Sequence, residues 1–352
     1  MSDPKPYTDL IDYPRLTAWF DAHLPDFGDG PLQAELLAGG TANAVFRMDR
    51  GRHGLVLRRP PKVPRADSEK QIAREARVLK ALGGTDVPHP RFHGFCDDKS
   101  VLGAPFYVMD MVNGWLGWGP PAPPPFDKPG EHRRNMAFAL VDAIARLANQ
   151  DYRKLGLEGF GKPDNFLGRQ VDRWRSQLES YKHEEGYAGR DLPGLQYAGD
   201  WLAANTPQMS PPGILHGDFS FGNCLFAYDT PTRAAAMIDW ELSTIGDPLL
   251  DLGWVTYGFN GRHEKTPTAA YFDPTDFPYR EELAEYYAER TGRDVSNLVY
   301  YNVLAQFKSA CILERHYARM LTGRQTREHG EVIGALVVRL AAKAGEMARN
   351  AG

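Results

Sequence analysis

The segment from residue 214 to residue 254, ILHGDFSFGNCLFAYDTPTRAAAMIDWELSTIGDPLLDLGW, decides how this chain is interpreted. Asp218 and Asn223 lie five residues apart, and Asp239 follows the apolar residues 235–238. The segment thus offers one candidate proton acceptor and two candidate metal ligands, on a loop and at a strand end. Phosphoryl transfer from a nucleotide requires this set, because one carboxylate orients the attacking hydroxyl while an amide and a second carboxylate hold Mg²⁺ on the phosphates.

Each of these residues also has an ordinary structural interpretation. Asp and Asn in loops commonly form turns through bonds to their own backbone, and an Asp after a strand often caps a helix. The ordered combination of His-Gly-Asp, Asn, Asp-Trp-Glu and Gly-Asp-Pro-x-x-Asp favours the catalytic interpretation. Its first part also has the spacing of the protein-kinase pattern H-R-D-x-x-x-x-N, with Gly217 in place of Arg.

The same segment, with residues 37–46 and 106–114, resembles the aminoglycoside phosphotransferase and choline kinase-like family over about residues 30–320. It looks closest to the branch that is fused to certain acyl-CoA dehydrogenases. The resemblance implies an α+β fold of the bilobal protein-kinase type and Mg²⁺-dependent transfer of phosphate from ATP or GTP to a small-molecule hydroxyl. It also implies that Asp218 accepts or orients the hydroxyl proton and that Asn223 and Asp239 bind Mg²⁺.

Composition narrows the class of protein. The 352 residues allow one large or two ordinary domains, and 42% hydrophobic with 24% charged residues is usual for a globular protein. A formal net charge of −4 without a block of like charges predicts no nucleic-acid or membrane partner. Three scattered cysteines and the lack of a signal-like N-terminus favour a cytoplasmic protein without disulfides. A monomer and a homodimer both remain open.

Periodicity predicts a β-rich first third. A helix over residues 14–24 precedes the first strands, and the stripe of Ile72, Ala76, Leu79 and Leu82 predicts a helix over residues 67–82 with Asp67 or Ser68 as its N-cap. A turn is expected at residues 97–104. The predicted strands span residues 32–38, 44–48, 55–58, 91–96 and 106–111. These elements predict a small antiparallel sheet with one long helix.

The composition changes after Gly114, where a Pro- and Gly-rich stretch excludes helix and central strand. We expect an N-lobe over residues 1–112, with residues 1–29 as a helical extension, and a C-lobe over residues 113–352. The hinge is expected at residues 110–114, and a loop and short hairpin over the catalytic segment. The predicted C-lobe helices span residues 131–150, 166–184, 193–205, 248–259, 279–291, 296–322 and 327–349.

The nucleotide is expected to contact a turn between the first two strands. Glycines allow backbone N–H groups to approach phosphate oxygens closely, although a Gly-Gly pair by itself is more often a hairpin turn. There is no Walker A motif. The candidate phosphate-binding residues are Gly39, Gly40, Thr41 and Asn43.

Two further parts of the nucleotide site follow from the resemblance. Arg58 stands where such folds usually carry a Lys, and Glu75 takes the place of the paired helix Glu. A guanidinium can hold Glu75 and still reach a phosphate, but Arg59 is an alternative for the inward position. The segment joining the lobes places Met109, Asp110 and Val112 at the purine, with backbone groups of Asp110 and Val112 bonding its edge.

Several residues are expected to support the catalytic loop. His216 is interpreted as structural rather than as a base, and Asp251 as an anchor that accepts backbone N–H bonds from the start of a buried helix. Asp247 is a good N-cap ahead of Pro248. Glu241, two residues after Asp239, is a candidate for supporting the metal ligands without binding the metal itself.

The acceptor is the part that the sequence determines least. Aromatic residues suggest a partly apolar pocket that fits a hydroxylated acyl compound, and the short span between Asp239 and Asp247 leaves no room for a peptide-docking segment. An aminoglycoside kinase, drawing on the acidic tract EELAEYYAER, and a catalytically weak nucleotide-binding or interaction module are the alternatives. A metal hydrolase is a further alternative, but the sequence lacks the cluster of His and Asp residues that such an enzyme would use to bind its metal. The candidate acceptor residues are Trp115, Trp118, Trp254 and Tyr257, with Phe259 beside them.

Overall fold

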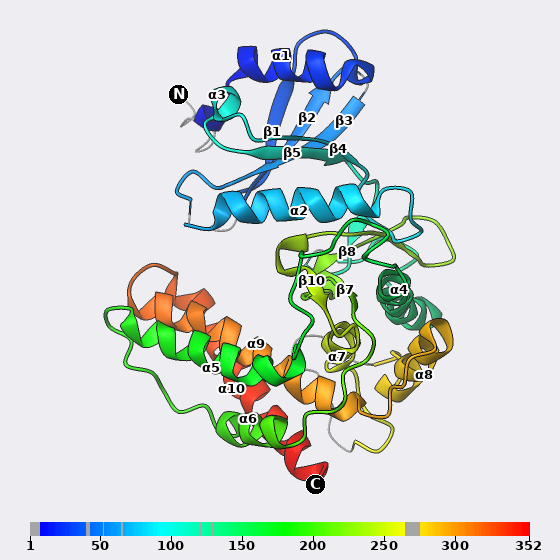
Figure 1. Cartoon of the computed structure of the whole chain (residues 1–352), viewed down its shortest axis with the longest axis vertical. Coiled ribbons are helices and arrows are strands. Elements are labelled where there is room, and N and C mark those ends of the chain that lie inside the picture. The colour runs from blue at the N-terminus through cyan, green and yellow to red at the C-terminus, as the bar shows by residue number, and fades with distance from the viewer. Residues whose placement is uncertain are drawn as a thin grey trace.

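The computed structural model describes residues 8–39, 43–51, 53–64, 66–119, 121–128, 130–264 and 275–352. Its N-terminal part contains a five-stranded antiparallel sheet in the order β1-β2-β3-β5-β4 (Figure 1). The five predicted strands are confirmed, with ends that differ by at most two residues. They are β1 Gln33–Gly39, β2 Ala44–Arg50, β3 His53–Arg59, β4 Phe92–Cys96 and β5 Phe106–Asp110.

Alternation along the strands gives the sheet two covered faces. On β5, Phe106 and Val108 join a cluster with Trp19 of α1 (Tyr13–His23), and the Trp19 and Phe106 rings meet edge-on with centroids 4.9 Å apart. Tyr107, between them, points the other way and packs in the cluster that contains α2 (Ser68–Leu82). Successive side chains of a strand point to opposite faces, so α1 and α2 cover opposite sides of the same sheet (Figure 1).

The helix α2 forms as its hydrophobic stripe predicts. Ile72, Ala76, Leu79 and Leu82 are all buried, and a stripe of this spacing lies on one face of a helix. Asp67 occupies the N-cap position, but its side chain makes no capping hydrogen bond. Packing of the apolar face, rather than the cap, therefore accounts for this helix.

Several short elements, among them a helix and an edge strand, were not expected. Residues 97–104 contain the helix α3 (Lys99–Leu102), which Asp98 caps through a 2.8 Å bond from the Ser100 N–H and Gly103 ends in a left-handed conformation. The Pro-rich stretch begins with a two-residue edge strand, β6 (Trp115–Leu116), paired with β8. Elements of two to four residues show no periodicity, so the sequence pattern could not reveal them.

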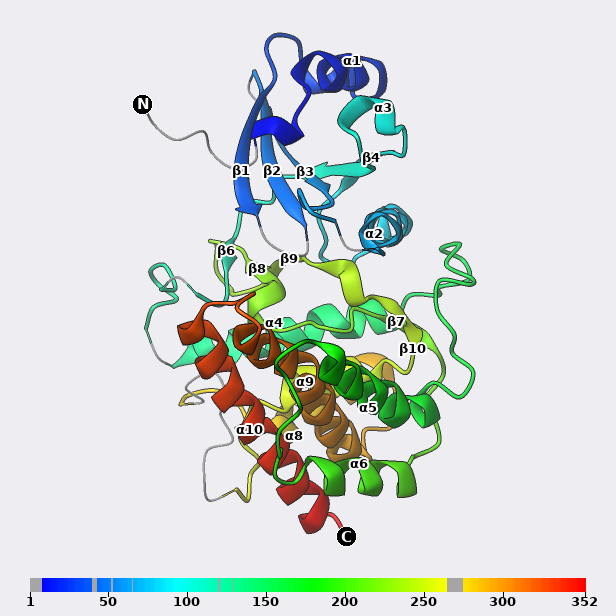
Figure 2. The same cartoon turned by 90° about the vertical axis from the view of Figure 1, so that its left-hand side faces the viewer.

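The C-terminal part is mainly helical, as predicted (Figures 1 and 2). Two small antiparallel sheets, β6-β8-β9 and β10-β7, interrupt the helices around the catalytic segment. Among the described helices, none combines the length and hydrophobicity that crossing a membrane requires. The elements are α4 Glu131–Ala148, α5 Gln170–Ser180, α6 Leu195–Ala204, β7 Gly213–Leu215, β8 Cys224–Phe226, β9 Ala234–Met237, β10 Thr244–Gly246, α7 Leu249–Thr256, α8 Arg280–Thr291, α9 Leu298–Leu321 and α10 Arg327–Asn350.

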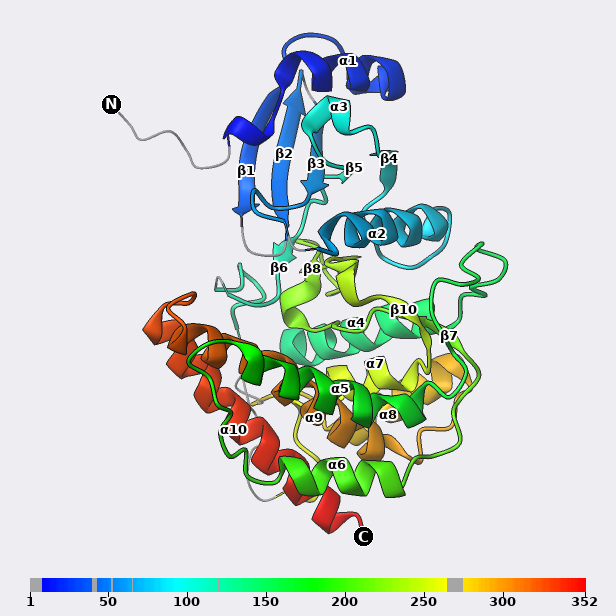
Figure 3. The same cartoon turned by 60° about the vertical axis from the view of Figure 1, so that its left-hand side comes forward.

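Two arginines of α2 form hydrogen bonds that join the N-terminal part to the C-terminal part. The Arg77 guanidinium donates to the carbonyls of Gly156 and Glu158, at 2.9 and 2.8 Å. Arg74 donates to the Ser243 carbonyl at 3.1 Å. All three cartoon views place α2 on the side of the sheet that faces the C-terminal part (Figures 1 to 3). The helix is therefore held between the sheet and the catalytic segment.

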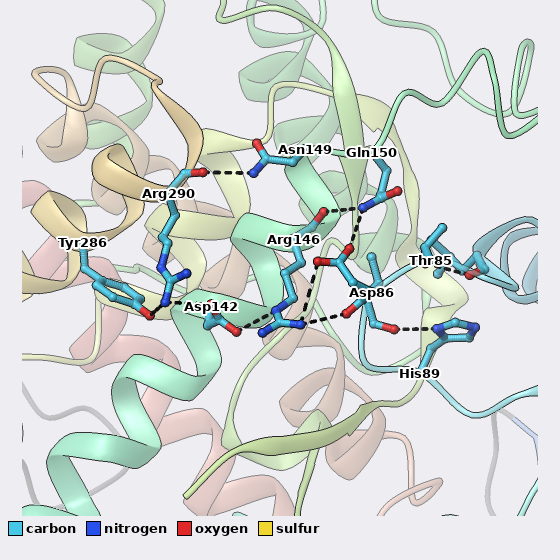
Figure 4. Close-up of polar contacts among 11 residues, drawn as sticks. Thr85, Asp86, His89, Asp142, Arg146, Asn149, Gln150, Tyr286 and Arg290 are labelled. Atoms are coloured by element: carbon cyan, nitrogen blue, oxygen red, sulfur yellow. Dashed lines mark hydrogen bonds and ion pairs between the residues drawn. The ribbon is translucent and has the colours of Figure 1, made fainter. Parts of the chain in front are cut away.

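A second set of contacts ties the turn after α2 to α4 and α8 (Figure 4). Gln150 donates to the Asp86 carboxylate at 3.0 Å, and Arg146 donates to the Asp86 carbonyl at 3.2 Å. Arg146 also binds Asp142 at 2.7 Å, and Asp142 lies 3.5 Å from Arg290 of α8. These groups are largely exposed, so each contact contributes little stability but together they fix an orientation.

Candidate active site

The β8–β9 hairpin brings the two predicted metal ligands together. Cys224 pairs with Met237 in this hairpin, and the Ile238 N–H donates to the Asn223 carbonyl at 2.9 Å. Asn223 and Asp239, sixteen positions apart in sequence, therefore flank the same end of the hairpin. The Asn223 amide donates to the Asp218 carbonyl at 2.8 Å and to the Asp218 carboxylate at 3.2 Å, so the catalytic-loop Asp joins this group.

The backbone conformation at position 217 explains why the residue before Asp218 is Gly rather than the Arg of the protein-kinase pattern. Its φ is +86°, in the left-handed region that favours glycine. A β-carbon at Gly217 would also lie only 2.5 Å from the Leu242 carbonyl oxygen. Both the turn and the close approach of the segment after Asp239 require glycine here.

Asp251 holds the backbone of the catalytic loop from the first turn of α7. Its buried carboxylate accepts the His216 N–H at 2.7 Å and the Gly217 N–H at 2.8 Å. Burial raises the pKa of Asp251 to about 6, while these two bonds oppose the rise. Asp247 lies one residue before the cap position, which Pro248 occupies, rather than at it as expected. It still accepts the Leu249 N–H at 3.0 Å.

His216 packs beneath the loop. Its ring is fully buried against Trp240, with centroids 4.8 Å apart, and its Nε2 lies 2.9 Å from the Ile238 carbonyl oxygen. Burial lowers the pKa of His216 to about 4. The ring is therefore neutral at pH 7, and its Nε2–H donates to Ile238, which links the catalytic loop to the strand end that carries Asp239.

Arg58 of β3 connects the five-stranded sheet to Asp239. Its Nε lies 2.9 Å from the Glu75 carboxylate, and its terminal nitrogen lies 2.6 Å from Asp239 Oδ1. Glu75 is fully buried and also accepts a 2.8 Å bond from the Tyr107 hydroxyl. Burial raises the pKa of Glu75 to about 7, and Arg58 opposes this rise. Arg59 faces the opposite side of β3, where it donates to the Leu10 and Leu102 carbonyls.

Only part of the predicted phosphate turn can be placed. Gly40 and Thr41 lie outside the described residues, and Gly39 ends β1 opposite Ala44. Asn43 is buried, and its amide lies 3.5 Å from the Glu75 carboxylate. This direction places the Asn43 side chain beside the Arg58–Glu75 pair.

The segment that was expected to join the two lobes begins where β5 ends, at Asp110. Its N–H donates to the Arg91 carbonyl at 2.9 Å. The Asp110 carboxylate lies 2.5 Å from His93 Nε2 on β4. Met109 and Val112 are half-buried. The sequence pattern gave no sign of the His93 contact, which depends on the pairing of β4 with β5.

Most of the predicted acceptor aromatics belong to the core. Trp115, Trp254 and Tyr257 are each only 7% exposed, and all three pack in the large hydrophobic cluster, as does Phe259. Tertiary packing overrides the expectation of an aromatic-lined pocket, because these rings have little surface left for a ligand. Trp118, 42% exposed, lies beside the catalytic loop, with its Cβ 3.9 Å from the position of a β-carbon on Gly222.

The surroundings of Asp218 are partly basic. Burial raises the pKa of Asp218 to about 7, with Asp239 and Glu241 adding to the rise and Lys308 and Asn223 opposing it. Glu241 is half-buried in the short 3₁₀ turn Trp240–Leu242 after Asp239. Lys308 was not predicted, because a single Lys in the helical run VLAQFKSACIL looks like an ordinary surface residue. It lies ninety residues downstream and reaches the loop only through the packing of α9.

The residues present fit a magnesium ion that also binds phosphates. Asn223 uses its amide nitrogen toward Asp218, which leaves its oxygen, and Asp239 is 36% exposed with one oxygen on Arg58. Within the described ranges, no group of three or more His, Cys, Asp or Glu residues could hold a metal by itself. Mg²⁺ is usually bound by one or two protein oxygens together with substrate phosphates and water.

A small antiparallel sheet with a buried Arg–Glu pair lies above a loop that carries Asp and Asn and a hairpin end that carries a second Asp. This combination defines the class of protein-kinase-like phosphotransferases. The chain belongs to the phosphotransferase enzyme family, whose sequence profile matches residues 33–295. Its members are small-molecule kinases. Both the family and the fold that the sequence predicted are thereby confirmed.

Individual relatives agree with this assignment. Acyl-CoA dehydrogenase family member 11 of Gallus gallus is 31% identical over 338 residues, which cover 93% of this chain and 42% of that protein. A Ralstonia eutropha protein, whose crystal structure is described as that of a candidate aminoglycoside phosphotransferase, superposes with a TM-score of 0.80 at 28% identity, covering 96% of this chain and 98% of that one. A GDP complex of a mutant aminoglycoside 2′-phosphotransferase IIIa shares the fold, with a TM-score of 0.62 at 16% identity, covering 96% of this chain and 100% of that one.

The chain spans less than half the length of the curated relatives that it matches. The matched region is 42% of the Gallus gallus protein and 41% of the Arabidopsis thaliana protein named probable acyl-CoA dehydrogenase IBR3. The dehydrogenase activity that these names describe is therefore a property of the relatives, and the shared region is the kinase-like one.

Proposed function

We propose that this protein is an active, Mg²⁺-dependent kinase that transfers the γ-phosphoryl group of ATP or GTP to a hydroxyl group of a small molecule. The observation that carries the proposal is the convergence of Asp218, Asn223 and Asp239 at one end of the β8–β9 hairpin, directly below Arg58. Residues 1–112 would form the nucleotide-binding lobe and residues 113–352 the lobe that carries the catalytic loop.

Asp218 is assigned to the acceptor. Its carboxylate accepts the proton of the acceptor hydroxyl while the hydroxyl oxygen forms a bond to the γ-phosphorus and the bond from that phosphorus to the β,γ-bridging oxygen breaks. The displaced nucleoside diphosphate retains that oxygen. Asn223, bonded to Asp218 at 3.2 Å, keeps the carboxylate aligned with the metal side of the cleft. A pKa near 7 suits a group that takes up a proton at neutral pH.

Asn223 and Asp239 would hold Mg²⁺, which when bound offsets the charge of the phosphates during transfer. Arg58 would contact a nucleotide phosphate while its ion pair with Glu75 fixes its orientation, since a guanidinium can serve two partners at once. On the purine side, we assign the backbone of Asp110 and Val112 and the side chain of Met109. The turn at residues 39–43 would cover the phosphates.

For the acceptor, we favour a neutral or anionic compound, with hydroxylated acyl compounds as the first class to test. The names of the curated relatives, which are acyl-CoA dehydrogenases, support this choice. So does the positive charge near the loop: Arg173, at the start of α5, lies close enough to Lys308 to disfavour its protonation. Trp118 offers a half-exposed apolar ring beside the loop.

An aminoglycoside acceptor is the second candidate, and the described carboxylates favour it less. Three of the four acidic residues of α8 already have partners: Glu282 binds Arg134 at 2.8 Å and Glu285 binds Arg262 at 3.0 Å. Glu281 accepts the Arg262 N–H at 3.0 Å. A polycationic sugar needs several carboxylates free of such partners, because each paired one is already neutralised.

The test is Mg²⁺-ATP turnover against a matched panel of hydroxy acids, their CoA esters and aminoglycosides, with phosphorylated products detected by mass. We expect product from the hydroxyacyl compounds, no product without Mg²⁺, and loss of product in Asp218→Asn. Efficient phosphorylation of aminoglycosides alone would refute the acceptor class. Nucleotide binding without phosphoryl transfer to any acceptor or to water would refute the kinase proposal and indicate an interaction module.

A further inference from the structure

Lys308 is a buried cation next to the catalytic loop. It lies on α9, is 4% exposed, and donates from Nζ to the Gly217 carbonyl oxygen at 2.5 Å. Its ammonium also lies over the rings of Trp254 and Trp174, at 4.3 and 5.4 Å from their centroids. Burying an ammonium is costly unless it is hydrogen-bonded and close to negative charge. The position of Lys308 therefore needs a reason beyond packing.

The loop supplies the charge and the hydrogen-bond acceptor. Burial lowers the pKa of Lys308 to about 8, and the nearby carboxylates of Asp218 and Asp251 oppose that shift, so Lys308 remains charged at pH 7. Its bond is made to a backbone carbonyl rather than to either carboxylate. The ammonium thus contacts the loop backbone while its field acts on the two Asp side chains.

The contact has a specific geometric consequence for Asp218. Gly217 is held from both ends: its N–H by the Asp251 carboxylate at 2.8 Å and its carbonyl by Lys308 at 2.5 Å. Gly217 also has a φ of +86°, and glycine can adopt more backbone conformations than other residues. Fixing both of its polar groups determines the peptide plane that leads into Asp218.

We propose that Lys308 is a positioning residue, which fixes the Gly217–Asp218 peptide from the α9 side and so aims the Asp218 carboxylate at the acceptor hydroxyl. The proposal rests on the kinase function proposed above. Asp251 and Lys308 would form a clamp whose two halves come from different helices, α7 and α9. Misplacing a reacting group by about 1 Å costs on the order of a hundredfold in rate, so such a clamp has kinetic value.

The test compares Lys308→Met, which keeps the length and the apolar contacts with the Trp rings, with the control Glu314→Gln. Glu314 is equally buried and lies further along α9, where it binds Arg190 at 2.6 Å and the Tyr187 hydroxyl, away from the loop. In Mg²⁺-ATP turnover, with water or the best acceptor, Lys308→Met should lower kcat about a hundredfold and leave KM for ATP within about threefold. Glu314→Gln should leave kcat unchanged.

Hydrogen–deuterium exchange gives a second readout that needs no turnover. The amides of His216 and Gly217 should exchange at least tenfold faster in Lys308→Met, while the amides of α10 keep wild-type rates. Unchanged exchange at these two amides would overturn the inference even if the wild-type protein proved not to be a kinase. Equal kcat in an active wild type and Lys308→Met would overturn it as well.

A variant that retains charge covers the case in which Lys308→Met does not fold. Lys308→Arg keeps donors and stacks well on Trp, but its guanidinium changes the distance to the Gly217 carbonyl. We expect kcat to fall at least threefold with KM for ATP unchanged, and faster exchange at the same amides. Wild-type kcat together with wild-type exchange in Lys308→Arg would show that the loop does not depend on this contact.

Discussion

Replacing Asp239 separates its proposed role in binding metal from its role in the fold. Asp239 adopts the left-handed conformation, with φ and ψ both 65°, which Asn tolerates and Ala does not. Its side chain is 36% exposed and forms one ion pair with Arg58, which keeps Glu75 as a second partner. A partly exposed ion pair contributes up to about 1 kcal/mol after screening, and left-handed Ala costs about 1–2 kcal/mol.

We therefore expect Asp239→Asn to lower the free energy of unfolding by less than about 1 kcal/mol and Asp239→Ala by about 2 kcal/mol. Both should lower kcat by about three orders of magnitude, the scale for groups that stabilise transition-state charge. Urea unfolding and Mg²⁺-ATP turnover measure the two effects. The control Asp229→Asn removes an exposed ion pair with Arg233 from the same hairpin and should change neither.

Two results would refute this reasoning. Turnover near the wild-type rate in a folded Asp239→Asn variant would show that Asp239 does not hold the metal. A loss of about 4 kcal/mol or more in unfolding free energy for Asp239→Asn would show that the residue is structural, because surface-linked contacts do not contribute that much.

Three further predictions concern the nucleotide side, pH and the join between the two parts. Arg58→Ala should raise KM for ATP and lower kcat, whereas Arg58→Lys should retain substantial activity. Arg59→Ala should instead lower thermal stability. Strongly reduced turnover in Arg59→Ala together with normal turnover in Arg58→Ala would reverse this assignment. Moving from pH 7 to pH 5 should destabilise the fold by about 2 kcal/mol through His216, because its folded-state pKa is about 4 and the unfolded His takes up a proton below about 6.5. Urea titrations should show a weaker dependence of the unfolding free energy on pH in His216→Gln, and an unchanged dependence would contradict the prediction. Arg146→Met should cost about 1 kcal/mol of unfolding free energy at low salt and less at high salt, since Arg146 and its partner Asp86 are exposed to the screening salt. A salt-independent loss would point to packing instead.

Much of the fold could be predicted because local patterns carry it. The stripe on α2, the short β-like runs of the strands and the turn residues between them are properties of short segments, and they placed the main helices and strands within a few residues. The catalytic segment could also be recognised, since the spacing of Asp218 and Asn223 depends on one loop and the position of Asp239 on one hairpin. Elements as short as α3 and β6 escaped, because two to four residues carry no period.

The burial of the aromatic residues could not be predicted in this way. Trp254 and Tyr257 follow the catalytic segment closely, so sequence proximity suggested a pocket. In the structure they lie in the core, where Trp254 packs beneath the Lys308 ammonium. Whether a large apolar residue faces solvent or core depends on which elements pack over it, and the sequence around the residue does not contain that information.

The sequence by itself determined the class of protein, the main helices and strands and the acidic residues of the candidate site, because these depend on spacing within single segments. Only the tertiary structure decided which arginine of β3 faces Glu75, since one residue of register reverses every side chain of a strand. It also decided the partners of the loop. Arg58 meets Asp239 across 181 residues and Lys308 meets Gly217 across 91, and contacts over such separations exist only when packing brings distant helices and strands together.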